Sequence, residues 1–423
     1  MTGMKIMNRN SRLVVTGMGA VTPIGIGVAE YWKNLVDGVC GVEKITRFDT
    51  ESLPVKIAAE VKGFDPLSYM PKKLTREMDV FMQYGYAAAM EALSQAGEEI
   101  ARPERFGITI GTALGGIAPI AETQDGISKG EHKKVSPRFV PKIIGNELAA
   151  QIAIEKGCLG PSLTIGTACS SGGDAISTAA MLLLTGQADA VLTVGAESAL
   201  TPLFILGLSS AHALSTNNDR PQMASRPFDK DRDGFVIGEG GGALLLETEE
   251  NARRRGAKIL AELSGFANCT DGYHVTSPHP DGIGAMFCME KAIEYAGLKK
   301  EDIGYVNTHG TSTPVGDPIE TNAIAKVFGE YTRKMAVTST KGATGHMMGA
   351  GGITEAIACI QCIREGIVPP TLNLDVLDEK CANLSYVPKK AVKKEVLAAM
   401  SNSFGFGGQN SSVVFSKPGL IDT

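Results

Sequence analysis

The residue best suited to covalent chemistry is Cys169, in the segment Gly166-Thr-Ala-Cys169-Ser-Ser-Gly-Gly173. The hydrophobic pattern predicts a buried strand before it and a helix after it. Unpaired N–H groups at a helix N-terminus favour a thiolate, so we expect a lowered thiol pKa. This shift would matter for a nucleophile, because a thiol with a pKa of about 8.5 is only about 3% ionised at pH 7. The alternative is a buried core cysteine, the usual state of a free thiol.

Two histidines lie in similar Gly-rich segments, Asn307-Thr-His309-Gly-Thr-Ser-Thr313 and Lys341-Gly-Ala-Thr-Gly-His346. We expect both, with Cys169, to follow strands whose carboxyl ends share one edge, where parallel α/β sheets collect catalytic groups. A single loop histidine is more often a surface residue. We interpret the other four histidines, which are His132, His212, His274 and His279, as structural or surface residues.

Strand and helix patterns alternate along the chain and then start again. The first series has predicted strands at 12–17, 106–111, 162–166 and 188–194, with helices at 75–96 and 172–184. The second has predicted strands at 258–267, 305–308, 335–339, 396–401 and 412–415, with helices at 284–296, 318–328 and 351–364. This alternation is typical of parallel sheets covered by helices. Thr164–Cys169 and Val337–Lys341 also look alike, which indicates either an internal duplication with a seam near 250–260 or two convergent strand-to-helix turns.

Composition excludes several classes of protein. The 423 residues are 43% hydrophobic and 21% charged, as in ordinary globular chains. The net charge of −5 argues against nucleic acid as a partner. No apolar run approaches the roughly 20 residues of a membrane span, and the N-terminus lacks the apolar region of a secretory signal. Eight scattered cysteines favour reduced thiols, so we expect a cytoplasmic protein with no membrane partner.

Three further patterns are incomplete. Asp229-Lys-Asp-Arg-Asp-Gly234 opens like a calcium loop, but Gly240 stands where the bidentate Glu belongs. Gly17-Met-Gly19 lacks the third glycine of a dinucleotide fingerprint. Cys359-Ile-Gln-Cys362 has redox spacing but lies in a predicted helix, which favours core packing. None of these predicts a cofactor.

The segments around Cys169, His309 and His346, together with Asn402-Ser-Phe-Gly-Phe406-Gly-Gly, resemble the β-ketoacyl-acyl carrier protein synthases, in particular the type II fatty-acid condensing enzymes. Matching segments run from about residue 11 to 416. The resemblance implies an α/β, thiolase-like fold with two duplicated halves in five layers, α/β/α/β/α. We expect one half at 11–256, with the nucleophile, and the other at 257–417, with both histidines.

The activity implied by this resemblance is a decarboxylative Claisen condensation. Cys169 would take an acyl group from acyl carrier protein and pass it to decarboxylating malonyl-carrier protein, which lengthens the chain by two carbons. His309 and His346 would stabilise the enolate, with electrostatic support from Lys341. The backbone N–H groups of Cys169 and Phe406 would form an oxyanion hole, and Phe406 would also gate the site.

The same resemblance implies the surroundings of the site. Its substrate-binding positions match Leu114, Thr276, Thr311, Thr313 and Phe404, and its cation-binding cluster in some members matches Asn307, Glu355, Asn402 and Ser403. No cofactor is expected, because phosphopantetheine arrives on the carrier protein. A homodimer is expected, with the acidic carrier protein docking on basic residues that include Lys72, Lys73, Arg76, Lys133, Lys134 and Arg138.

Related enzymes supply the alternatives. A polyketide ketosynthase would share Cys169, His309 and His346 and differ in partner and pocket. A non-catalytic chain-length partner would lack the nucleophile. A thiolase would carry a second catalytic cysteine in place of one histidine, and the initiating synthase would carry an asparagine there.

Overall fold

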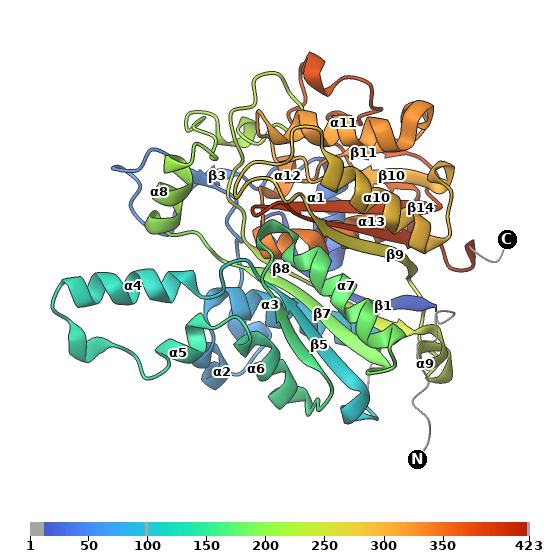
Figure 1. Ribbon diagram of the computed structural model, residues 1–423. Coiled ribbons are helices and arrows are strands. Elements are labelled where there is room, and N and C mark those ends of the chain that lie inside the picture. Colours follow the sequence, from blue (N-terminus) through green and yellow to red (C-terminus); the bar gives the residue numbers. More distant parts are fainter. Residues whose placement is uncertain (1–11, 98–99, 421–423) are drawn as a thin grey trace.

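The computed structural model describes residues 12–97 and 100–420 (Figure 1). Residue 11, where the first half was expected to begin, lies outside these ranges. Within them, no helix is long and apolar enough to cross a membrane.

Two sets of five strands with the same order build the molecule. In the first set the order is β6-β5-β7-β8-β1, and in the second it is β11-β10-β14-β15-β9. We number the strands of each set by their position in the chain. From the outer edge of the sheet inwards, both sets then have the order third, second, fourth, fifth, first. The first set comprises β1 (Leu13–Thr22), β5 (Phe106–Gly111), β6 (Ser162–Ile165), β7 (Ala190–Glu197) and β8 (Gly240–Thr248). The second comprises β9 (Ala261–Thr270), β10 (Ile303–Asn307), β11 (Ala336–Thr338), β14 (Ala398–Gly405) and β15 (Gln409–Ser416).

This shared order decides between duplication and chance similarity. The two look-alike segments follow β6 and β11, which are the third strands of their sets. Equivalent places in two identical topologies are expected of a duplicated unit, so the duplication is confirmed and the convergent-turn alternative is wrong. The sets meet where β1 pairs with β9 at Val14–Glu262 and Val15–Ala261.

Helices complete five layers. The outer face of the first sheet is covered by α3 (Val80–Ala96), and α6 (Glu147–Lys156) packs on α3 and β5. Between the sheets lie α7 (Ser171–Leu184) and α13 (Gly351–Glu365), which contact each other. The outer face of the second sheet carries α10 (Ile283–Ala296), with α11 (Gly316–Phe328) beside it (Figure 1).

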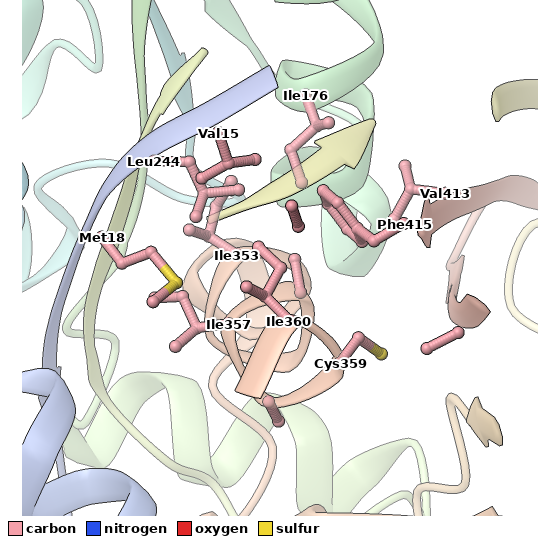
Figure 2. Packing of buried hydrophobic residues seen from close by; sticks show 14 of the residues in the cluster. Val15, Met18, Ile176, Leu244, Ile353, Ile357, Cys359, Ile360, Val413 and Phe415 are labelled. Carbon is pink, nitrogen blue, oxygen red and sulfur yellow. The ribbon is translucent and has the colours of Figure 1, made fainter. Parts of the chain in front are cut away.

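The central layer holds the largest apolar core. Figure 2 shows Ile353, Ile357 and Ile360 of α13 between side chains of β1 and β8 and those of β15. Because strands β1, β7 and β8 are covered on both faces, every residue in β1 and β7 is buried, which explains their continuous apolar patterns. Gly17 and Gly19 serve packing: a Cβ would lie 2.1 Å from Ala92 O at Gly17 and 1.9 Å from Ala88 O at Gly19.

Shorter elements extend from this framework. A segment with α4 (Ile117–Ser128), a 3₁₀ turn (His132–Lys134) and α5 (Phe139–Ile143) projects on the side of α2 (Lys72–Glu77) (Figure 1). The others are α1 (Val28–Asp37), α8 (Pro202–Ser210), α9 (Glu249–Arg254), α12 (Lys341–Thr344), β2 (Gly25–Ile26), β3 (Glu43–Lys44), β4 (Ile57–Ala58), β12 (Ile367–Val368) and β13 (Val392–Lys393).

One predicted helix is wrong. The pattern indicated a single helix at 75–96 capped by Thr75, but the chain forms α2 and α3 with an extended break at Met78 and Asp79. Thr75 donates its hydroxyl to Lys72 O within α2 rather than capping a helix. Met78 at the break is almost fully buried in the same apolar cluster as Phe81, so the chain changes direction inside the core.

Candidate active site

One cavity of about 470 Å³ is lined by most of the residues that the sequence analysis singled out. Cys169 from the first half lines it with His309, His346 and Phe406 from the second. All five predicted substrate-binding residues line it as well, namely Leu114, Thr276, Thr311, Thr313 and Phe404. Residues that are far apart in the sequence therefore meet in one cavity, where the two duplicated halves contact each other.

A strained turn presents Cys169 one 3₁₀ turn before α7. Ala168 has a φ of 51°, which is uncommon for a residue with a side chain. Hydroxyl groups hold the turn: Ser171 donates to Ala168 O at 2.6 Å, and Asp174 Oδ2 accepts from Ser170 at 3.0 Å. Asp174 is a positioning residue that the sequence reading missed, although an acidic residue in a first helical turn is a recognisable signal.

The loop after β14 meets this turn. A Cβ at Gly405 would lie 2.7 Å from Thr167 O and 3.2 Å from Cys169 N, so only glycine permits the approach. The backbone N–H groups of Phe406 and Cys169 both interact with the Cys169 sulfur and lower its pKa. This is the arrangement that an oxyanion hole at the acyl carbonyl requires.

The expected fall in the Cys169 thiol pKa is wrong in direction. Burial among protein atoms raises this pKa to about 11, and Lys341 and the two N–H groups oppose the rise only in part. Desolvation of the thiolate thus outweighs the helix N-terminus. The Cys169 thiol is therefore protonated near neutral pH, and an attack by its sulfur would need a proton acceptor.

The rings of His309 and His346 meet edge to face in the lining of the cavity. Their ring centroids are 5.3 Å apart and the planes are nearly perpendicular, at 86°. Burial holds the pKa of each well below the usual range, and the nearby Lys341 ammonium lowers both further. Three of their ring nitrogens are buried without a protein partner, His309 Nδ1 and both nitrogens of His346. The site therefore offers two neutral imidazoles with hydrogen-bonding capacity to spare.

His309 directly follows β10, and Cys169 follows β6 after a short turn. A short helix, α12, separates His346 from β11. His346 instead forms an isolated bridge with Ile237, and its N–H donates to Val236 O at 2.7 Å. The expectation that all three groups follow strand ends is therefore wrong for His346.

Buried carboxylates that the sequence reading missed support the catalytic loops. Glu320 of α11 accepts the backbone N–H groups of His309 at 2.8 Å and Gly310 at 2.7 Å. Glu197, at the end of β7, accepts Ala113 N at 2.7 Å and Gly349 N at 3.2 Å. Burial raises the pKa of each carboxyl to about 7. Their only signal in the sequence is an acidic residue at a strand end or beside a Gly-rich turn.

Lys341 lies behind the cavity rather than in its lining. It is 2% exposed and pairs with the buried Glu355. The ammonium group of Lys341 lies near both imidazoles and the thiol, and it lowers the pKa of each of them.

The expected cation cluster is only partly suited to an ion. Asn307 Oδ1 and Glu355 Oε2 are buried oxygens without a hydrogen-bond partner, which suits a hard cation. Asn402 Oδ1 already accepts from Ser412 at 2.8 Å, and Asn402 Nδ2 contacts the Met289 sulfur. Across residues 12–97 and 100–420, no group of three His, Cys, Asp or Glu side chains could hold a metal.

The incomplete motifs have structural roles. The Asp229 carboxylate accepts hydrogen bonds from the backbone N–H groups of Asp231, Asp375 and Val376. In the segment that resembles a calcium loop, Asp229 therefore connects two distant loops of the chain. Cys359 and Cys362 are fully buried in the core around α13, as expected from packing.

Comparisons with known proteins agree with this geometry. Residues 10–252 match the family model described as beta-ketoacyl synthase, N-terminal domain, and residues 260–375 match the C-terminal domain. The chain is 47% identical to a 3-oxoacyl-[acyl-carrier-protein] synthase 2 of Vibrio cholerae, over 96% of this chain and 99% of the relative. The Coxiella burnetii protein of the same name is 43% identical, over 96% and 98%.

Solved structures extend the comparison. A beta-ketoacyl synthase from Burkholderia phymatum superimposes with a TM-score of 0.89 at 35% identity, covering 96% of this chain and 99% of that one. A ketosynthase solved with a type II polyketide acyl-carrier protein gives 0.88 at 31%, with the same coverage. With its duplicated α/β halves and a cysteine facing two histidines, the chain belongs to the β-ketoacyl synthase family.

Proposed function

We propose that the cavity carries out both half-reactions of a β-ketoacyl synthase in fatty-acid elongation, with the residues in the following roles. The observation that carries this assignment is the meeting of one thiol, two neutral imidazoles and two inward backbone N–H groups in a single cavity. An acyl group moves from a carrier-protein thioester to Cys169, and a decarboxylated malonyl unit then accepts it.

In the first half-reaction, the Cys169 sulfur attacks the acyl thioester carbonyl. The negative charge on the carbonyl oxygen is held by the N–H groups of Cys169 and Phe406. The thiol proton passes to an imidazole, because both rings are neutral and so can accept it. The departing phosphopantetheine sulfur takes up that proton, which leaves the acyl-enzyme and a free thiol.

In the second half-reaction, His309 and His346 donate N–H groups to the malonyl thioester oxygen. Loss of CO₂ leaves an electron pair that spreads onto this oxygen, where the two donors stabilise the enolate. The enolate carbon attacks the acyl-Cys169 carbonyl, and the cysteine sulfur leaves as a thiolate and takes up a proton from solvent. The product is a β-ketoacyl thioester that is two carbons longer.

Phe406 separates the two substrates. It lines the cavity, is 39% exposed, and precedes Gly407 and Gly408, whose φ values of 86° and 73° suit glycine. We assign it as the gate between the acyl pocket, which Leu114 lines, and the entrance that Thr276 and Thr311 line.

The carrier protein docks on the basic surface beside α2. Arg138 binds Glu77 at 2.7 Å, which brings the basic residues after α4 next to those of α2. A second basic run in the sequence is Arg253-Arg-Arg255. Its Arg255 interacts with Glu247 and donates to Ala96 O, which supports a structural role there. We expect Lys73→Glu with Lys133→Glu to raise KM for the carrier protein and spare transfer from a small thioester, whereas Lys299→Glu, the control, changes neither.

A homodimer pairs the β6 edges of two copies. β6 pairs with β5 on one side only and ends the first sheet, and its residues Ser162, Leu163 and Thr164 are exposed. Proteins usually cover or blunt such a free sheet edge, so a second copy is a suitable cover. Leu159 and Leu163 beside it are 77% and 46% exposed. Light scattering should give twice the 44.4 kDa chain mass, and Leu163→Lys should shift it towards the monomer.

Separate assays of the half-reactions test the residue roles. Cys169→Ala should abolish condensation, and acyl-carrier protein should leave one acyl adduct on the wild type, at Cys169, by mass spectrometry. His309→Ala or His346→Ala should slow malonyl decarboxylation more than loading of Cys169. An adduct elsewhere, or equal loss in both half-reactions, would contradict the assignment.

A further inference from the structure

Two thiols outside the catalytic constellation contact each other beside the gate. Cys269 lies near the end of β9 and Cys288 lies in α10, which packs on β9. The Cys269 thiol donates to Gly284 O at 3.0 Å, one helical turn before Cys288. The Cys288 thiol donates to Ala267 O at 3.2 Å, two residues before Cys269. Each sulfur therefore lies against the backbone next to the other cysteine, and the two side chains interact directly.

The two thiols differ in the way that a peroxide-sensitive pair requires. Cys269 is partly exposed, and its hydrogen bond with Cys288 lowers its pKa. Cys288 is fully buried, and the same interaction together with burial raises its pKa. A partly exposed thiol with a lowered pKa next to a second thiol is the usual arrangement of a redox-sensitive cysteine. Cys359 and Cys362 have redox spacing in sequence, but both are buried with raised pKa values.

Backbone contacts connect this pair to the gate. Asn410 is the strand partner of Cys269, and its O lies 3.5 Å from the Cys288 sulfur. Its Nδ2 donates to Asp271 Oδ1 at 2.8 Å and to Gly408 O at 3.2 Å. Asp271 N donates to the same Gly408 O at 2.7 Å. Since Gly408 is two residues from Phe406, movement of the β9 end reaches the gate loop through two hydrogen bonds.

We propose that Cys269 is a site of reversible oxidation, that Cys288 converts it to a disulfide, and that this bond restrains the Phe406 loop. The Cys269 thiolate attacks a peroxide, takes one oxygen as a sulfenic acid and releases hydroxide. The Cys288 sulfur then displaces water from Cys269 and forms the S–S bond. Two thiols are oxidised and hydrogen peroxide is reduced to two waters. A dithiol such as dithiothreitol reverses the step.

The covalent step is tested in the Cys169→Ala background, so that oxidation of the nucleophile cannot interfere. Hydrogen peroxide should lower the intact mass by about 2 Da, for the loss of two hydrogens, and a digest should contain a Cys269–Cys288 peptide. Cys269→Ser should remove that peptide, and Cys359→Ser, the matched control, should keep it. An unchanged mass, stable sulfenic acid at Cys269 or a bond between other cysteines would overturn the proposal.

The effect on the gate is tested with Cys169 intact. The enzyme is loaded with an acyl group to protect Cys169, exposed to peroxide, treated with catalase and assayed for malonyl-dependent turnover. The wild type should lose turnover and regain it with dithiothreitol, whereas Cys288→Ala should keep its own starting rate. A disulfide that forms and leaves turnover unchanged would overturn the restraint on the gate.

Discussion

Replacing Lys341 with methionine removes a buried charge that has two separate roles. It neutralises Glu355, and it lowers the pKa of both His309 and His346. Methionine has a similar length, so the perturbation is chiefly electrostatic. Stability and chemistry should therefore change through different partners, which a second substitution can separate.

The stability change follows from the burial of the pair. Lys341 and Glu355 are 2% and 3% exposed, and removal of one partner from a buried pair costs about 3–5 kcal/mol. With an unfolding entropy of about 2.1 cal/mol/K per residue over 423 residues, Tm should fall by about 3–6 °C. Lys341→Met with Glu355→Gln leaves no unpaired charge and should recover most of this loss.

The chemical change should persist in the double variant. Without the ammonium group the pKa of each imidazole rises, although burial still keeps it below the usual range. The low-pH limit of Cys169 acylation, set by protonation of the accepting imidazole, should move to higher pH in both variants. Calorimetry and a pH profile of acyl loading measure the two effects. A double variant that recovers Tm and also the wild-type pH profile would refute the electrostatic role of Lys341.

Three other predictions concern single residues. Because the pKa of the Cys169 thiol is about 11, its alkylation by iodoacetamide should rise about tenfold per pH unit from pH 7 to 10, and a plateau by pH 8 would show a lowered pKa instead. Glu197 binds a proton more tightly in the folded state, with a pKa of about 7, than in the unfolded chain, so its contribution to stability falls as pH rises from about 4.5 to 7. Urea unfolding should show the wild type losing stability across this window relative to Glu197→Gln, and parallel curves would contradict the shift. Phe406→Ala should let malonyl-carrier protein be decarboxylated before Cys169 is acylated, so uncoupled CO₂ release should rise; unchanged coupling would exclude the gate.

Short-range sequence patterns predicted many of the strands, helices and turns of this protein. The continuous apolar pattern of β1, the Gly-rich turns beside Cys169 and His309, and the repeat after β6 and β11 all reflect short-range rules of packing and turn formation. The alternation of strands and helices and the suspected duplication could therefore be predicted from the residue pattern. The site residues were named by resemblance, and the structure brings Cys169, His309, His346 and Phe406 together.

What the sequence could not determine depends on burial. The helix N-terminus next to Cys169 indicated a lowered thiol pKa, but desolvation in the folded interior raises it. The pattern of residues 75–96 suited one helix, but the folded chain breaks it at Met78, which is buried in the core. Glu320, Glu197 and the neighbouring thiols Cys269 and Cys288 have no distinctive spacing in the sequence. Desolvation and contacts between distant segments exist only once the chain has folded, so the tertiary structure alone decided the protonation of the site and the groups that hold it in place.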